Sequence, residues 1–314
     1  MRTFELEYPH ALVFNELPET VTAIGFFDGI HCGHQRVIQT AVSEAKNRNM
    51  ESAVITFFPH PSVVLKKDAQ HVKYITPLRE KKEILKRLGV DRLYIIKFNK
   101  ALASLSPQGF IDHFIKGLNI KHVVAGFDFS YGHKGKGNME TIKEHAADAF
   151  SYTTISKVEL DNEKISSTRI RECLKKGQIE KANELLGRPL IVDGIVIKGE
   201  QRGKALGYPT ANIDTNRDAL LPKTGVYAVK IIYKNERYEG MASLGVNPTF
   251  TPDLLEPVLE VNIFDYNNDL YGDELLVEFH AFIREEQKFA GAAQLIKKIA
   301  EDEVKIRNYF AKNC

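Results

Sequence analysis

Apolar and polar segments alternate regularly through the first half of the chain. Five short apolar runs predict strands, at residues 21–27, 53–58, 92–98, 122–129 and 153–160. Four stretches with helical spacing lie between them and predict helices, at residues 35–48, 77–88, 107–117 and 139–150. Strands that alternate with helices indicate a parallel sheet with helices on both faces, which is an α/β fold.

The pattern changes in the second half. Residues 166–168 (SST) are expected to cap a helix over 169–176, and a second helix is expected over 179–186, ending at Gly187. Five β-rich segments follow, at residues 190–197, 225–233, 238–246, 258–264 and 274–283, and a final helix is expected over 291–310. Short strands separated by turn clusters favour an antiparallel barrel or sandwich. We therefore predict two domains, residues 1–186 and 187–314.

Composition narrows the class of protein. A chain of 314 residues exceeds one ordinary core, and its 43% hydrophobic and 27% charged content is typical of globular proteins. The net charge of +2, with dispersed basic residues, argues against a nucleic-acid partner. Cys32, Cys173 and Cys314 lack metal-ligand spacing, which predicts free thiols. The absence of a signal-like N-terminus and of any apolar run of 18 residues predicts a cytoplasmic protein without membrane contact.

The most informative segment is residues 24–34 (IGFFDGIHCGH). A strand, an Asp28-Gly29 turn and a helix follow one another there, so His31 and His34 are expected at the carboxyl end of a parallel strand, where ligands bind. Helix N-termini favour phosphates, and Gly33 permits close approach. Two other interpretations compete: a zinc site of His31, Cys32 and His34, and a pair of ordinary loop histidines.

Three more segments of the first half end strands or begin helices. Residues 56–61 (TFFPHP) either form part of a site or only terminate a strand. Residues 126–137 end a strand and add Lys134 and Lys136 in a glycine-rich loop, which favours phosphate binding or a solvated loop equally. In residues 165–171 (ISSTRIR), hydroxyl groups, free N–H groups and Arg171 offer donors to phosphates, although the same residues also suit a plain helix cap.

Two features of the second half carry chemistry. Residues 199–212 (GEQRGKALGYPTAN) form a glycine-rich loop in which Thr210 and Asn212 supply hard oxygen donors suited to Mg²⁺. A long β-connection with a kink at Pro209 is the competing interpretation. Glu260 lies in a predicted strand, where it could act as a general base or simply face solvent.

Taken together, the motifs resemble the bifunctional bacterial riboflavin kinase/FAD synthetase family over nearly the whole chain. The matching elements are Gly25-x-Phe27-Asp28-Gly29-x-His31-x-Gly33-His34, Thr56-Phe57-x-Pro59-His60-Pro61, Gly126-x-Asp128-Phe129-x-Tyr131-Gly132, Ser166-Ser167-Thr168-x-x-Arg171, Gly207-Tyr208-Pro209-Thr210-Ala211-Asn212, Gly245-x-x-Pro248-Thr249-Phe250 and Asp269-Leu270-Tyr271-Gly272. Their order and joint presence make the resemblance specific.

The resemblance implies a Rossmann-like nucleotidyltransferase domain followed by a six-stranded antiparallel barrel with a C-terminal helix. The barrel domain would phosphorylate riboflavin with ATP, giving FMN and ADP. The first domain would transfer AMP from a second ATP to FMN, giving FAD and pyrophosphate. Both steps would use Mg²⁺. The resemblance makes no prediction about oligomeric state.

The resemblance also implies residue roles. His31, His34 and Glu260 would be catalytic, with Glu260 taking the proton of the riboflavin 5′-hydroxyl. The residues expected to bind ATP or its phosphates are Gly25, Phe27, Asp28, Gly33, Ser167, Thr168, Arg171, Gly207, Pro209, Thr210 and Asn212. Thr210 and Asn212 would also hold Mg²⁺. The residues expected to contact flavin are Phe58, Asp128, Phe129 and Arg284.

Two other functions remain open on the sequence. The first domain also resembles other His-x-Gly-His transferases, such as the pantetheine-phosphate adenylyltransferases, although residues 207–212 argue against that substrate. A flavin-binding carrier without ATP turnover is the non-enzymatic alternative, and it leaves the histidine pair and Glu260 without a common purpose.

Overall fold

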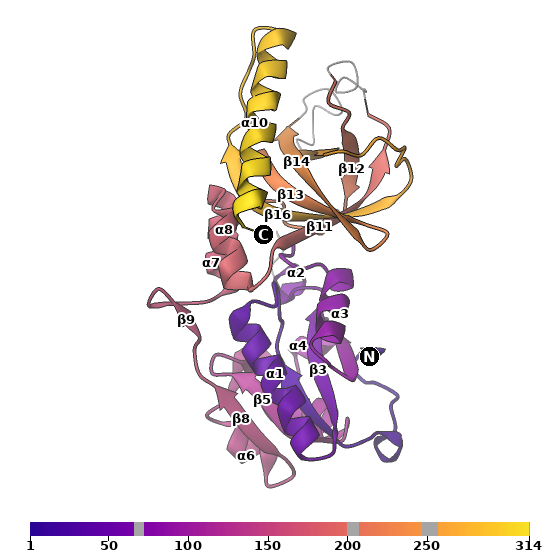
Figure 1. Cartoon of the computed structure of the whole chain (residues 1–314). Helices are drawn as coiled ribbons and strands as arrows, with labels where there is room; N and C mark the ends of the chain where they lie inside the picture. The colour runs from indigo at the N-terminus through magenta and orange to yellow at the C-terminus, as the bar shows by residue number, and fades with distance from the viewer. Residues whose placement is uncertain (66–71, 200–206, 247–256, 314) are drawn as a thin grey trace. The chain divides into compact units, whose positions relative to one another are not determined.

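The computed structural model describes residues 1–65, 72–199, 207–246 and 257–313, which form two compact units, Met1–Ser167 and Thr168–Cys314 (Figure 1). Helices α7 (Ser167–Lys176) and α8 (Ile179–Leu186) group with the second unit. Asn183 ties α8 to the strands of the second unit, because its side chain donates to the Phe279 carbonyl and accepts from the Leu190 N–H, both at 2.8 Å. The expected division after residue 186 stays a prediction. Among the described residues, no helix combines the length and apolar character that a membrane crossing needs.

The first unit contains a six-stranded sheet whose neighbouring strands are all parallel. Its order is β1 (Arg2–Leu6), β4 (Arg92–Lys97), β3 (Glu51–Phe58), β2 (Thr20–Ile24), β5 (Ile120–Gly126) and β8 (Ser151–Ile155). The prediction of a parallel sheet is confirmed. The chain runs from β2 to β3 on one side, and β5 pairs with the other side of β2, so the strand order reverses between β2 and β5. Open α/β sheets bind ligands at such a switch point.

Helices cover both faces of this sheet. On one face, α1 (Cys32–Asn47) and α3 (Leu78–Arg87) pack Ile38 and Leu85 against Val54 and Leu93. The opposite face packs residues of α5 (Pro107–Phe110), of the π-helical turn η2 (Ile111–Lys116) and of α6 (Ile142–Ala146) against the remaining strand residues. Alternate residues of each strand therefore enter different cores, which is why the strands are apolar throughout.

Several elements differ from the expected ones. The helix expected over 107–117 is divided into α5 and η2, and the one expected over 139–150 is only α6. β1 was not predicted, because it pairs on one side only and its burial alternates, so it lacks a continuous apolar run. The other short elements of this unit are η1 (Phe14–Glu16), α2 (Pro61–Leu65), α4 (Lys100–Ala103), β6 (Ser130–Tyr131), η3 (His133–Gly135), β7 (Gly137–Asn138), β9 (Glu159–Leu160) and β10 (Glu163–Lys164).

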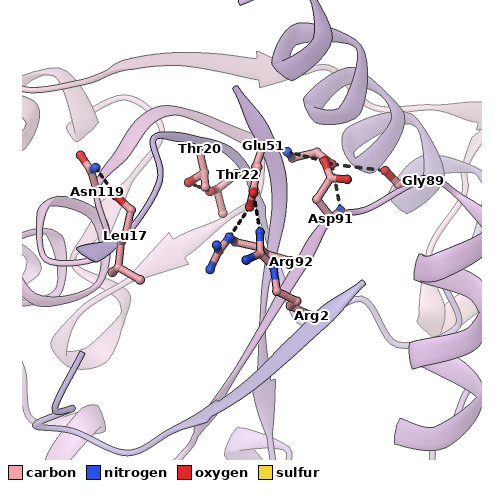
Figure 2. A network of polar contacts seen from close by, with 10 residues as sticks. Arg2, Leu17, Thr20, Thr22, Glu51, Gly89, Asp91, Arg92 and Asn119 are labelled. Atoms are coloured by element: carbon pink, nitrogen blue, oxygen red, sulfur yellow. Dashed lines mark hydrogen bonds and ion pairs between the residues drawn. The ribbon is translucent and has the colours of Figure 1, made fainter. Parts of the chain in front are cut away.

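Polar contacts tie the amino ends of the strands together (Figure 2). Glu51, at the start of β3, forms ion pairs with Arg92 of β4 and with Arg2 of β1. The Asp91 carboxylate accepts hydrogen bonds from the Ser52 N–H at 2.9 Å and from the Ser52 hydroxyl at 2.7 Å. This network fixes the amino edge of the sheet, so the loops at the carboxyl edge project from a rigid base.

The second unit is a closed antiparallel barrel, which confirms the barrel that the resemblance implies and excludes the sandwich that the residue pattern left open. Its strands follow the order β11 (Leu190–Ile197), β12 (Ala211–Thr215), β15 (Pro257–Ile263), β14 (Glu236–Val246), β13 (Gly225–Tyr233) and β16 (Glu274–Arg284). Helix α10 (Ala292–Lys312) covers part of the outer wall, where Ile306 and Phe310 pack on Val226 and Ala281. β12 was not predicted, because Ile213 is its one large aliphatic residue.

Candidate functional site

The segment between β2 and α1 makes two sharp reversals in the first unit. Phe27 (φ 53°) and Ile30 (φ 39°) adopt left-handed backbone conformations that are costly for side chains of their size, about 1–3 kcal/mol each. Burial holds them there, since Phe27 is 2% exposed and Ile30 is fully buried. Gly25 is needed, because a Cβ at this position would lie 2.8 Å from the Phe27 ring. Packing of these buried side chains therefore holds the turn in its strained conformation.

Helix α1 begins at Cys32, three residues before the expected start, because His31 serves as its N-cap. The His31 Nδ1 accepts a hydrogen bond from the His34 N–H at 3.2 Å. The two imidazoles stack with ring centroids 3.6 Å apart and planes 19° apart. A Cβ at Gly33 would approach the His31 ring to 3.1 Å, so this glycine allows the stacked arrangement.

Both histidines are neutral at pH 7. Burial, aided by the positive charge of Lys164, lowers the pKa of His31 to about 4. Burial lowers the pKa of His34 well below its usual value, and repulsion from His31, Lys81 and Lys164 lowers it further. Because Nδ1 of His31 accepts a hydrogen bond, its proton lies on Nε2. His31 is thus a neutral donor held in one orientation.

Two more groups support the same turn. The Asp28 side chain, 4% exposed, accepts from the Thr76 N–H at 3.2 Å, and the Asp28 carbonyl accepts from the Ser167 hydroxyl at 2.9 Å. Lys81, which the sequence reasoning did not select, is 3% exposed and donates to the Phe26 carbonyl at 2.8 Å. The sequence pattern of α3 could have indicated its burial, because Lys81 shares the buried stripe of the helix with Ile84 and Leu85.

The end of β5 lies beside the end of β2. Asp128 there is exposed and pairs with Lys164 at 2.6 Å. Phe129 is partly buried and stacks on Tyr131 with centroids 5.9 Å apart, and Phe58 packs on the core near Tyr74. The structure therefore brings Asp128 to the strand next to the histidine turn, whereas Phe58 and Phe129 give much of their surface to the core.

The other residues expected to contact phosphates in the first site lie at the start of α7 or in the segment after β6. Ser167 begins α7, and Thr168 and Arg171 follow on the same helix in the second unit. Lys134 and Lys136 are exposed. The zinc interpretation gains no support, because the described residues contain no cluster of three histidine, cysteine or acidic side chains that could hold a metal.

The barrel site depends on strand register. Asn212 of β12 lies directly opposite Glu260 of β15, and Glu260 lies opposite Ser243 of β14. Their neighbours Ile213 and Leu259 are buried in the barrel, so these three side chains occupy its outer wall. Gly199 leaves room for the observed Asn212 side chain, because a Cβ at Gly199 would lie 2.0 Å from the Asn212 amide nitrogen. An amide and a carboxylate thus share one face.

A cavity of about 380 Å³ lies at the other face of these strands, where the paired residues Ala211 and Val261 line it. Pro209 and Thr210 line it on one side, and Tyr266 and Tyr271 of the loop after β15 on the other. The Asn262 side chain, 7% exposed, donates to the Pro209 carbonyl at 2.7 Å and so fixes the entry to β12. Residues 200–206 of the glycine-rich loop and 248–250 of another matching motif lie outside the described residues.

Arg284 ends β16 and is engaged with the C-terminal helix. Its Nε donates to the carboxylate of Asp302 at 2.6 Å, and Asp302 is fully buried. The expected flavin contact of Arg284 stays a prediction. The ion pair shows a structural task for this side chain that the sequence did not reveal.

An α/β unit with a paired-histidine turn beside its switch point, followed by a closed barrel with an Asn–Glu pair on its wall, defines a two-domain nucleotide-dependent transferase. Residues 14–169 match the FAD synthetase family and residues 186–310 match the riboflavin kinase family. The chain belongs to the bifunctional riboflavin kinase/FMN adenylyltransferase family.

Individual relatives agree over almost the full length. The chain is 44% identical to the bifunctional riboflavin kinase/FMN adenylyltransferase of Bacillus subtilis over 99% of both chains. It is 34% identical to the Escherichia coli protein of the same name over 92% of both. A crystal structure from Streptococcus pneumoniae, described as a macrolide-efflux protein, is 35% identical with a TM-score of 0.89 and covers 98% of this chain and 99% of that one.

Proposed function

We propose that this protein makes FMN and FAD from riboflavin in two ATP-dependent steps. The barrel unit transfers the terminal phosphoryl group of ATP to riboflavin, giving FMN and ADP. The α/β unit transfers AMP from a second ATP to FMN, giving FAD and pyrophosphate. The observation that carries the proposal is that each unit has its own candidate site: the stacked histidines beside the switch point and the Asn212–Glu260 pair on the barrel wall.

In adenylyl transfer, an FMN phosphate oxygen attacks the α-phosphorus of ATP, and pyrophosphate leaves. Negative charge grows on the α-phosphate oxygens, where fixed donors lower the barrier. His31 donates there through Nε2–H, and His34 stacks beside it. Gly25, Phe27, Asp28 and Gly33 shape the turn. His31 is already ordered before ATP binds, because its Nδ1 accepts a hydrogen bond from the His34 N–H in the folded protein.

The other contacts of this step are also proposals. Ser167, Thr168 and Arg171 hold phosphates from the start of α7, where free N–H groups favour anions. Asp128 contacts the flavin beside the turn, and its exposure and its place after β5 support this role. Phe58 and Phe129 offer ring edges to the flavin from the core.

In phosphoryl transfer, Glu260 accepts the proton of the riboflavin 5′-hydroxyl while that oxygen attacks the terminal phosphorus. Asn212 lies opposite Glu260 and orients the reacting groups. The cavity beside Pro209 and Thr210 receives the adenosine of ATP, since the aromatic rings of Tyr266 and Tyr271 suit a planar base. Gly207, with φ 83°, turns the chain into this segment. Arg284 contacts the flavin from the end of β16.

Both steps are proposed to need Mg²⁺. The Thr210 hydroxyl and the Asn212 amide oxygen are hard donors two residues apart in the chain at the start of β12, which fits a cation that retains several waters. Mg²⁺ held by these residues would offset the charge of the phosphate oxygens. We also propose a cytoplasmic location, in keeping with Cys32 and Cys173, which form no disulfide.

The decisive experiment supplies riboflavin or FMN separately, each with ATP and Mg²⁺, and separates the products by chromatography. We expect FMN and then FAD from riboflavin, and FAD and pyrophosphate from FMN. Failure to form either flavin nucleotide would refute the proposal. Omission of Mg²⁺ with added chelator is expected to abolish both products.

A further inference from the structure

Lys81 is a cation buried under the histidine turn. It lies on the inner stripe of α3 and is 3% exposed. Burial lowers the pKa of Lys81 to about 8, partly opposed by the negative charge of Asp28, so the ammonium is still largely protonated at pH 7. A buried ammonium is costly unless the fold uses its charge.

The contacts of Lys81 converge on one peptide of the turn. Its Nζ donates to the Phe26 carbonyl at 2.8 Å and lies 3.4 Å from the Thr56 hydroxyl. The Thr56 hydroxyl donates to the same carbonyl at 2.9 Å. The Phe26 ring lies over the ammonium, 4.9 Å from its centroid. Lys81 thus holds the peptide that leads into the left-handed Phe27.

The charges around the turn show why this cation matters. His31 and His34 are neutral at pH 7, so the histidine pair brings no net charge to a polyphosphate. Lys164 is held by Asp128 in an ion pair of 2.6 Å. Asp28 adds negative charge nearby, and the buried ammonium of Lys81 offsets it from within the core.

We propose that Lys81 is a positioning residue for adenylyl transfer, holding the Phe26–Phe27 peptide in its phosphate-receiving conformation and placing a fixed positive charge behind it. This inference rests on the proposed function of the α/β unit. A purely structural role makes a different prediction, because both activities would then fall together with the melting temperature, whereas a positioning role lowers FAD formation alone.

The test compares Lys81→Met with the wild-type full chain. For FAD formation from FMN, kcat/KM for ATP is expected to fall at least about tenfold, since the charge and the donor are both lost. Formation of FMN from riboflavin serves as an internal reference and is expected to stay within about twofold, because it belongs to the barrel. The melting temperature is expected to fall modestly, because the Phe26 carbonyl and Asp28 lose a buried partner, with the variant still folded at the assay temperature.

Three further variants separate charge, hydrogen bond and fold. Lys81→Gln keeps an N–H donor without charge and is expected to remain at least about fivefold below the wild type. Thr56→Val removes only the hydroxyl donor and is expected to cost less than about threefold. Lys82→Met is the matched control, because Lys82 is the next residue of α3 and its partly exposed side chain pairs with Glu5 at 3.7 Å. It is expected to leave FAD formation unchanged.

Two results would overturn the inference: FAD formation within twofold of the wild type in folded Lys81→Met and Lys81→Gln, or parallel losses of FAD and FMN formation that follow a lower melting temperature. A wild type that makes FMN but no FAD would instead overturn the proposed function of the α/β unit. The two failures are distinguishable, because one is measured against an active wild type.

Discussion

The two sites of this protein are built in opposite ways. In the α/β unit, the proposed reacting groups come from ten consecutive residues, 25–34, and burial holds them in a strained turn with stacked, neutral histidines. On the barrel, Asn212 and Glu260 come from separate strands and meet because of strand register on an outer wall. A local sequence motif can therefore define the first site, whereas only pairing across the barrel defines the second.

The comparison predicts that each site can be removed without the other. Glu260→Gln is expected to lower FMN formation from riboflavin by about 10³-fold, because the general base is lost while its shape is kept. FAD formation from supplied FMN is expected to stay near the wild-type rate. Chromatography of both reactions checks this, with the exposed Glu236→Gln as the matched control on the same barrel. Equal loss of both activities would contradict the division of labour.

His31→Asn is the corresponding change in the α/β unit. Asparagine is a good N-cap, so α1 keeps its start while the imidazole donor is lost. FAD formation from FMN is expected to fall by about 10²-fold, and FMN formation is expected to be unchanged. The same chromatographic assay and a thermal melt give the answer. Loss of FMN formation by a folded variant would show that the site assignment is wrong.

The buried histidines also predict that the stability of the α/β unit and that of the barrel respond differently to acid. The unfolded His31 binds a proton below about pH 6.5, but the folded one does so only below about 4, so protonation favours unfolding between these values. Stability of the α/β unit is expected to fall as pH drops from 6.5 to 4, by about 3 kcal/mol from His31 alone. Urea unfolding followed by circular dichroism at pH 7 and pH 5 measures this. His31→Asn should flatten the dependence, and an unchanged slope would contradict the cause.

A smaller effect is expected at the barrel cavity. Asn262→Leu removes the hydrogen bond to the Pro209 carbonyl and leaves this acceptor unpaired. We expect a loss of about 1–3 kcal/mol in stability and a several-fold higher KM for ATP in FMN formation. Thermal melts and initial rates check both, with FAD formation from FMN as the reference. A variant with unchanged KM would show that the Pro209 segment needs no such fixing.

The sequence predicted much of the α/β unit because its signals are local. Five strands and the helix after His31 follow from apolar runs and a turn, and the helix begins three residues earlier than expected because His31 itself caps it. Lys81 was missed, since a lysine on an apolar stripe is normally taken as exposed. Its role depends on the Phe26 carbonyl, 55 residues away in the chain.

In the barrel, the sequence indicated which residues carry chemistry but not which of them lie next to one another. Glu260 and Asn212 were selected separately, and no short-range pattern indicated that they face each other. The buried pairing of Arg284 with Asp302 was not predicted either, because both partners look like ordinary surface charges.

The sequence by itself determined the two kinds of fold, the order of the motifs and the family, because periodicity and contiguous motifs are properties of neighbouring residues. Only the tertiary structure decided the protonation of the histidines, the burial of Lys81 and the facing of Asn212 and Glu260. Desolvation and strand register depend on atoms that are distant in the chain, and these become neighbours only when the core closes.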